Sequence, residues 1–187
     1  MADIPSLSAM GHRIIILGPS NAGKSTLATA LAQTLDIPAI HLDQFRHLPN
    51  TDWQVRPDAE FHALHDAAIA ASAWIMDGNY SRLLPQRFER ATGVIVLDDH
   101  YLHRFARYLR RTLFEKQRAG ALEGNRDTIK WQMLSWIWKT RSSVGRYRGF
   151  AAATGLPMVD CRSMADIRAL YRHWGLRRPS ASTAPGE

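Results

Sequence analysis

Cysteine is nearly absent from this 187-residue chain, in which Cys161 is the single example. One thiol excludes an intramolecular disulfide and any metal site built from several cysteines. We assign no metal site to the eight histidines either, although His62 and His65 are three residues apart. Since Cys161 lies in the apolar run MVDC, we expect a buried structural thiol rather than a nucleophile.

Long apolar runs are also missing. Every uninterrupted run is far shorter than the roughly 20 residues that cross a bilayer, so the sequence predicts no membrane span. The first segment, MADIPSLSAMGHR, has an acid, a proline and serines where a signal peptide needs a basic start and an apolar centre. We therefore expect a cytoplasmic protein. Its length and its apolar fraction of 45% fit one α/β domain with a substantial core.

Positive charge is abundant but unevenly distributed. The net charge is +7, yet residues 101–150 alone hold twelve Lys and Arg against three acidic residues, so the remainder is slightly acidic. Such a concentration predicts a polyanionic partner, which would be a nucleoside triphosphate, a phosphorylated substrate or a nucleic acid. For the outlying cations of this segment, a solvated helix face is the alternative.

Short apolar blocks typical of buried strands alternate with segments of helical periodicity. The blocks are RIIIL (13–17), AIHLD (39–43), WIMDG (74–78), VIVLD (94–98) and MVDC (158–161). Helices are expected at 24–35, at 57–73, from about residue 100, and from Ser163, with Asp166 completing a capping box, to Trp174. This alternation predicts a parallel sheet wrapped by helices. The polar tail 177–187 is expected to be disordered.

The segment GPSNAGKS, residues 18–25, matches the pattern G-x-x-x-x-G-K-[ST] between a predicted strand and a predicted helix. In such a loop the backbone N–H groups point at phosphate oxygens, assisted by the positive end of the helix. Lys24 would reach the β- and γ-phosphates of ATP, and the Ser25 hydroxyl would bind Mg²⁺. The predicted ATP-binding residues are Gly18, Ser20, Asn21, Ala22, Gly23, Lys24, Ser25 and Thr26.

This loop alone does not distinguish a kinase from a GTPase or a motor ATPase. The chain has no N-K-x-D motif for recognising guanine, and a motor ATPase normally has a longer chain with an acidic strand ending in Asp-Glu. Two predicted strands end in aspartate, one at Asp77 and one at Asp98, which Asp99 follows. Either strand end is suited to orienting the water shell of Mg²⁺.

Several motifs outside the loop resemble the small P-loop kinases known as topology modulation proteins, which are relatives of adenylate kinase. They are HLDQF, WIMDGNYSR, VIVLDDHYLHRFARYLRR and WQMLSWIWKTR, and the resemblance extends to about Trp174. It implies a three-layer α/β sandwich of the P-loop NTPase class, similar to nucleoside and shikimate kinases, with a five-stranded parallel sheet ordered 2-3-1-4-5. In that order the third strand lies beside the strand before the loop, which favours Asp77 over Asp98 as the magnesium residue.

The same resemblance implies the domain organisation. One kinase domain would extend over residues 1–176, with a helical acceptor-binding insert at about 44–73 and an arginine-bearing lid at about 104–148.

Four residues outside the loop are predicted to contact the phosphoryl acceptor. Asp43 ends the second predicted strand, at the sheet edge where open α/β proteins bind ligands, and would accept a proton from an acceptor hydroxyl; a helix N-cap is the alternative. Arg82 is similar in position to the arginine that holds acceptor phosphate in adenylate kinases, although their DGFPR is DGNYSR here; a surface salt bridge is the alternative. Asn79 and Trp53 complete the set.

Four arginines lie in or near the predicted lid, namely Arg107, Arg110, Arg111 and Arg141. A lid that closes one or two guanidinium groups over the transferring phosphoryl would stabilise its charge and exclude water. We favour Arg107 and Arg111, one helical turn apart, together with Arg141 as catalytic residues alongside Lys24 and Asp43.

These features predict a P-loop phosphotransferase that moves the γ-phosphate of ATP, with Mg²⁺, onto a small-molecule or nucleotide acceptor. Catalysis would consist mostly of positioning and charge stabilisation. One alternative is a nucleic-acid-associated regulatory ATPase, which the basic segment and the family's name suggest. A third is an ATP-binding module without turnover.

Overall fold

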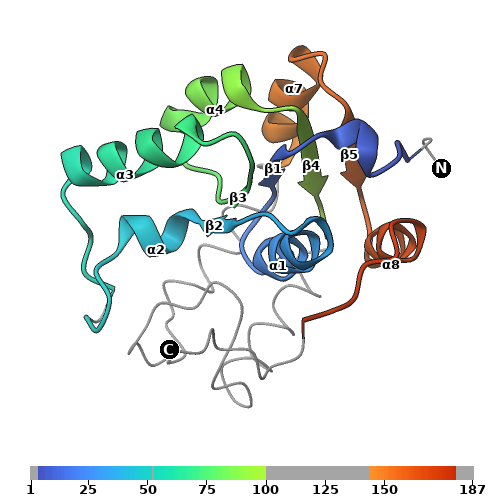
Figure 1. Ribbon diagram of the computed structural model, residues 1–187, viewed down its shortest axis with the longest axis horizontal. Coiled ribbons are helices and arrows are strands. Elements are labelled where there is room, and N and C mark those ends of the chain that lie inside the picture. Colours follow the sequence, from blue (N-terminus) through green and yellow to red (C-terminus); the bar gives the residue numbers. More distant parts are fainter. Residues whose placement is uncertain (1–3, 52, 100–143, 180–187) are drawn as a thin grey trace.

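The protein is built in three layers, with a parallel sheet between two layers of helices (Figure 1). The computed structural model describes residues 4–51, 53–99 and 144–179. Its strands are β1 Arg13–Leu17, β2 Ala39–His41, β3 Trp74–Asp77, β4 Gly93–Leu97 and β5 Met158–Cys161. They are parallel and lie in the order β2-β3-β1-β4-β5, which confirms the predicted α/β sandwich and its 2-3-1-4-5 sheet.

The strand register brings the carboxyl ends of the central strands together. Ile16 of β1 lies opposite both Asp77 of β3 and Ile95 of β4, and His41 of β2 also lies opposite Asp77. Because the strands run parallel, the loops that follow them meet at one edge of the sheet, which is where open α/β folds bind ligands.

Six helices lie within the described ranges: α1 Lys24–Leu35, α2 Leu42–Arg46, α3 Asp58–Ala70, α4 Leu84–Arg90, α7 Val144–Ala153 and α8 Met164–His173. Two short 3₁₀ turns accompany them, η1 Ser8–Met10 and η2 Ser81–Leu83. Helices α1 and α8 cover one face of the sheet, and α3, α4 and α7 cover the other (Figure 1).

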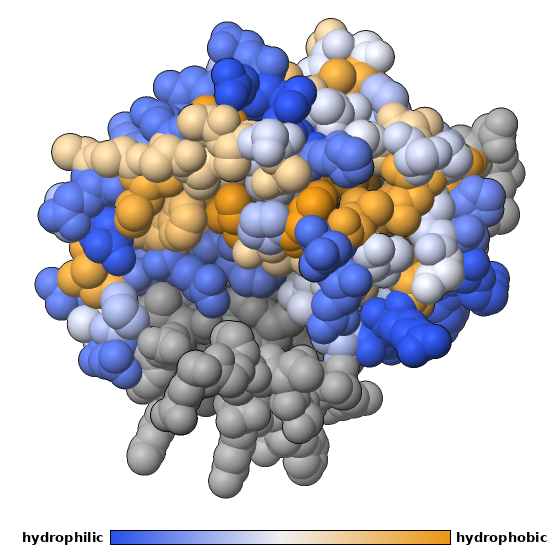
Figure 2. Space-filling model, viewed as in Figure 1, coloured by the Kyte–Doolittle hydropathy of each residue, from blue (hydrophilic) through white to orange (hydrophobic). Residues whose placement is uncertain are grey.

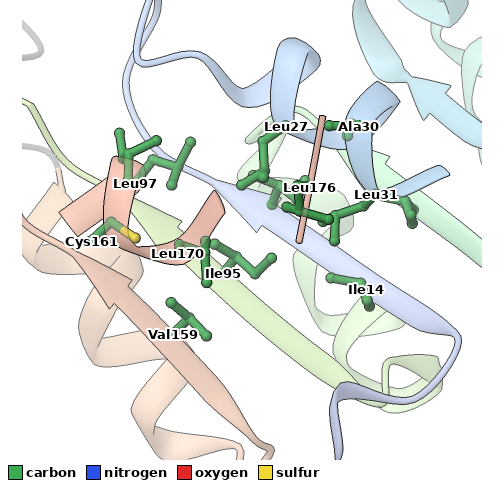
Figure 3. Packing of buried hydrophobic residues seen from close by; sticks show 14 of the residues in the cluster. Ile14, Leu27, Ala30, Leu31, Ile95, Leu97, Val159, Cys161, Leu170 and Leu176 are labelled. Carbon is green, nitrogen blue, oxygen red and sulfur yellow. The ribbon is translucent and has the colours of Figure 1, made fainter. Parts of the chain in front are cut away.

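Strand side chains alternate between two buried apolar clusters, one on each face of the sheet. Ile14 faces the first cluster, in which Leu31 of α1 and Leu170 of α8 pack against the sheet (Figure 3). Ile15 faces the second cluster, which includes residues of α3, α4 and α7. Cys161 is buried in the first cluster as expected, and burial raises the pKa of its thiol to about 12.

The largest differences from the sequence prediction are at β2 and α3, whereas β3, β4 and α8 differ by one residue. The second strand ends at His41, because the chain turns there into α2 and buries Leu42 completely in the second cluster. Asp43 therefore lies in the first turn of a short helix, not at the end of a strand, and the N-cap of that helix is His41. Helix α3 starts after Pro57 and ends at Ala70, short of the predicted residue 73.

Several predicted features fall partly or wholly outside the described residues. These are the helix from about residue 100, all but the last residues of the lid at about 104–148, and residues 180–187 of the tail. The described part of the insert at 44–73 contains α3 and an antiparallel bridge between His47 and Val55.

On the face shown in Figure 2, hydrophobic residues are not scattered evenly. In the orientation of Figure 1, hydrophobic residues form a broken band across the middle of the visible face, with hydrophilic residues above and below (Figure 2). Within the described ranges, the structure contains no helix that is long and apolar enough to cross a bilayer.

Candidate active site

The glycine-rich loop connects β1 to α1 at the carboxyl edge of the sheet, as its sequence predicts. Gly18 has φ +144°, and a Cβ atom there would lie 2.3 Å from the backbone oxygen of Leu97. Gly23 has φ +94° and directly precedes α1. Both positions therefore require glycine, one for close approach to β4 and both for their backbone conformation.

The predicted ATP-binding residues surround the start of α1. Gly18 and Ala22 are buried, Ser20, Asn21, Lys24 and Ser25 are half-buried, and Gly23 and Thr26 are exposed. The ammonium group of Lys24 donates a hydrogen bond to the Pro19 carbonyl at 3.0 Å, so this side chain folds back over the loop. A cation and a helix N-terminus therefore meet at the same turn, which is the arrangement that binds a chain of phosphates.

Ser25 and Asp77, the two residues predicted to bind Mg²⁺, are in direct contact. The Ser25 hydroxyl donates to Asp77 Oδ2 at 2.6 Å, and Nδ1 of His41 donates to Asp77 Oδ1 at 2.8 Å. Asp98, the rejected candidate, instead pairs with Arg148 of α7 at 3.4 Å. A hydroxyl and a carboxylate side by side are the hard oxygen donors that Mg²⁺ prefers, with water completing its shell. The described residues contain no group of three or more His, Cys, Asp or Glu that could hold a metal ion.

Asp77 is held as a carboxylate by its neighbours. Its burial favours the neutral acid, but the hydrogen bonds from His41 and Ser25 and the charge of Lys24 outweigh burial and hold the pKa of Asp77 below its ordinary value. This carboxylate is therefore ionised at neutral pH, as a magnesium residue must be.

Asp43, a predicted acceptor contact, has an exposed carboxylate that is oriented by a tyrosine. The Tyr80 hydroxyl donates to Asp43 Oδ1 at 2.6 Å, and the Tyr80 ring packs against Phe61 of α3 with centroids 5.0 Å apart. Burial and the neighbouring Asp43 charge raise the pKa of Tyr80, so the phenol stays a neutral donor. One carboxylate oxygen is thus occupied by tyrosine.

The other predicted acceptor contacts are dispersed. Both polar atoms of the Asn79 side chain are bonded to Gly18, with its amide donating to the Gly18 carbonyl at 2.9 Å and its oxygen accepting from the Gly18 N–H at 3.1 Å. Arg82 is exposed in η2 and makes no hydrogen bond or ion pair with the other described residues. Trp53 lies in the insert with its ring edge-on to His47, centroids 5.3 Å apart.

Solved structures of two shikimate kinases are similar to this chain in overall fold. One from Bacteroides thetaiotaomicron matches with a TM-score of 0.51 and 17% identity over 86% of this chain and 97% of that one. Another, from Acinetobacter baumannii in complex with shikimate, matches with a TM-score of 0.51 and 16% identity over 90% and 93%. The chain therefore shares the fold of these kinases. No protein-family profile and no curated protein sequence matches it.

Three residues that contribute to the candidate site were not predicted to do so. His41 bonds to Asp77, and Tyr80 bonds to Asp43. The buried Arg87 of α4 donates a hydrogen bond to the backbone carbonyl of Gly78, which directly follows Asp77. The sequence held a signal for His41, since its register partner across β2 and β3 is Asp77. It held none for Arg87, whose partners are backbone carbonyls rather than side chains.

The predicted lid residues Arg107, Arg111 and Arg141 lie outside the described residues. Their roles stay predictions. Two described arginines close to that segment in sequence, Arg146 and Arg148, lie on α7, where Arg148 pairs with Asp98 and with Asp160 of β5.

Proposed function

We propose that this protein is an ATP-dependent phosphotransferase that moves the γ-phosphate of ATP onto a small-molecule acceptor. The observation that carries the proposal is the contact between Ser25, directly after the loop lysine, and Asp77 on the adjacent strand. A glycine-containing turn without nucleotide has no need of a buried carboxylate held ionised beside a lysine and a serine.

In the donor half, the loop from Gly18 to Thr26 would bind ATP. Backbone N–H groups around Ser20, Asn21, Ala22 and Gly23 and the ammonium group of Lys24 are suited to the phosphate oxygens. Ser25 and Asp77 would hold Mg²⁺, which neutralises charge on the phosphates when bound.

In the acceptor half, Asp43 would act as the base. With Oδ1 bonded to Tyr80, its Oδ2 is left for an acceptor O–H group. As the acceptor oxygen forms its bond to the γ-phosphorus, the bond from that phosphorus to the bridging oxygen breaks, ADP leaves, and Asp43 takes the hydroxyl proton. Arg82, Trp53 and Asn79 stay proposed acceptor contacts, with Arg82 the residue most available for an anionic group.

The lid residues Arg107, Arg111 and Arg141 would supply the guanidinium groups that stabilise charge on the transferring phosphoryl. The proposed organisation keeps one kinase domain at 1–176, with the insert at about 44–73 and the lid at about 104–148. The motifs quoted above favour a relative of the topology modulation proteins, and a cytoplasmic location remains part of the proposal.

A second candidate is a regulatory ATPase that binds nucleic acid. The observation in its favour is the charge of residues 101–150, with twelve basic residues against three acidic ones. Binding through several DNA phosphates weakens steeply as salt rises, whereas transfer to a small acceptor does not. Salt dependence of the two activities therefore separates the candidates.

The proposal is tested by measuring ADP formation from Mg-ATP with a panel of nucleosides, nucleotides, sugars and hydroxy acids, including shikimate. We expect one class to raise ADP formation well above the rate with water alone, and Lys24→Ala to abolish the increase. If no class raises the rate, and DNA does so instead, the regulatory ATPase replaces the kinase.

A further inference from the structure

Three consecutive backbone carbonyls converge on one buried guanidinium group. Arg87 is fully buried; its Nη1 donates to the Gly78 carbonyl at 2.7 Å, and its Nη2 donates to the carbonyls of Asn79 and Tyr80. Its Nε donates to the Leu83 carbonyl, so all its hydrogen bonds among the described residues go to the backbone. Burial lowers the pKa of Arg87 to about 10, which still leaves it charged at neutral pH.

A buried cation without a carboxylate is costly, by several kcal/mol per ion, unless its surroundings hold it firmly. The loop of residues 78–80, whose carbonyls hold the Arg87 side chain, is itself in an uncommon backbone conformation. Gly78 has φ +119° and Tyr80 has φ +30°, and a Cβ on Gly78 would lie 2.9 Å from that of Leu42. Such backbone states persist only where surrounding contacts impose them, and here those contacts include the hydrogen bonds of Arg87.

The side chains of this loop reach the two halves of the proposed site. Asn79 makes two hydrogen bonds to Gly18, the first residue of the phosphate loop, and Tyr80 makes one to Asp43, the proposed base. Arg87 has no contact with either Gly18 or Asp43 among its hydrogen bonds. Its hydrogen bonds therefore reach the site only through residues 78–80.

We propose that Arg87 is a positioning residue that holds the loop 78–80, and that it fixes the phosphate loop through Asn79 and the acceptor carboxylate through Tyr80. This inference rests on the proposed binding of ATP to the loop. Without the guanidinium group, three carbonyls lose their common donor and the loop relaxes. Gly18 then loses its anchor, although no residue that would touch the nucleotide has changed.

The test measures Mg-ATP affinity by titration calorimetry for Arg87→Lys, Arg87→Met, Asn79→Ala and the double variant Asn79→Ala/Arg87→Lys. Asn79→Ala removes two hydrogen bonds, so its Kd should rise by about tenfold. Arg87→Lys should cause a similar loss, and Arg87→Met, which keeps no donor, a larger one. Arg90→Lys, an exposed change on the same helix, is the matched control and should leave Kd unchanged.

The double variant separates positioning from a general loss of stability. If Arg87 acts through Asn79, the double variant should bind ATP no more weakly than Arg87→Lys alone, because both changes remove the same anchor. Fully additive losses, or unchanged affinity in folded Arg87→Lys, would overturn the inference. Should neither Arg87 variant fold, Asn79→Ala decides, since unchanged affinity overturns the inference and a tenfold loss supports it. A wild-type protein that does not bind Mg-ATP would instead remove the proposed function itself.

Discussion

At the scale of one residue, the surroundings of Asp77 control its charge and orientation in the proposed donor site. Asp77 is 4% exposed, yet it accepts hydrogen bonds on both carboxylate oxygens and lies near the Lys24 charge, so its pKa is depressed despite burial. The same two hydrogen bonds orient the carboxylate toward Ser25. A magnesium residue needs both properties, charge at neutral pH and a fixed orientation.

Replacing Asp77 with Asn keeps its size but removes the charge that would organise Mg²⁺. We expect kcat to fall by about 10- to 100-fold with a modest change in ATP affinity. Asp98→Asn, the matched change directly after β4, should have a smaller effect because Asp98 pairs with Arg148 instead. Steady-state kinetics of both variants measure the two losses of kcat. A larger loss for Asp98→Asn than for Asp77→Asn would show that the carboxylate that organises Mg²⁺ follows β4 and is not the one on β3.

The buried side chain of His65 makes the folding stability of the protein depend on pH. Its side chain is fully buried on α3, its Nδ1 bonds to Asp66, and its Nε2 has no hydrogen-bond partner among the described residues. Burial therefore lowers the pKa of His65. As pH falls through about 6.5, the unfolded chain binds a proton at this histidine that the folded chain does not, and folded stability is lost.

We expect His65→Leu to weaken this pH dependence. Between pH 7.5 and 5, the wild-type free energy of unfolding should fall more steeply than that of the variant, by at most about 1.4 kcal/mol per pH unit. Urea unfolding of both proteins at four pH values measures the two free energies of unfolding. The other histidines are present in both proteins, so their contributions cancel when one free energy is subtracted from the other. Parallel curves for the two proteins would mean that His65 takes up its proton equally in both states.

The site was predictable where it depends on sequence spacing and not where it depends on backbone shape. The pattern of the loop gave Lys24 and Ser25, and the strand order gave their neighbour Asp77. The contacts of Tyr80 and Arg87 follow from positive φ angles at residues 78 and 80 and from carbonyls that turn inward. No spacing of side chains encodes those angles.

At the scale of elements, the strands and α1 agreed closely with prediction. Buried parallel strands are recognisable in a sequence as short apolar runs separated by turn-forming residues. Strand β1 and helix α1 have the predicted bounds. Strand β2 was predicted too long, since the apolar Leu42 continues the strand pattern while starting a helix. Helices α4 and α7 were not predicted individually; α4 has only seven residues, and α7 is rich in glycine and arginine.

The N-cap half of the predicted capping box of α8 is confirmed and gives a prediction for one element; the backbone N–H that bonds to Asp166 is that of Arg162, not that of Ser163. The Asp166 N–H donates to Ser163 Oγ at 3.2 Å, and the Asp166 carboxylate accepts from the Ser163 hydroxyl and the Arg162 N–H. Ser163→Ala should lower the free energy of unfolding by about 1 kcal/mol. Ser72→Ala, at an exposed serine outside the helices, is the control. Equal stability of the two variants in thermal unfolding would contradict the cap's contribution.

At the scale of the whole molecule, the basic segment 101–150 is where the two functional candidates make different predictions. If it is a catalytic lid, Arg107→Ala or Arg111→Ala should lower kcat by on the order of a hundredfold, with little change in ATP binding. If it binds DNA, each change should weaken duplex binding modestly and reduce the salt slope by about one, with basal turnover unaffected. Turnover and DNA affinity at two salt concentrations, measured on the same preparations, distinguish these outcomes.

The central claim is that the loop after β1 binds ATP for phosphoryl transfer, and Lys24→Ala tests it most directly. Lys24 is half-buried at the start of α1 and is not part of either apolar cluster, so the variant should fold. The decisive measurement is Mg-ATP affinity together with ADP formation in the folded variant. We predict that binding or turnover is lost relative to wild type. Wild-type affinity together with undiminished turnover would contradict the account.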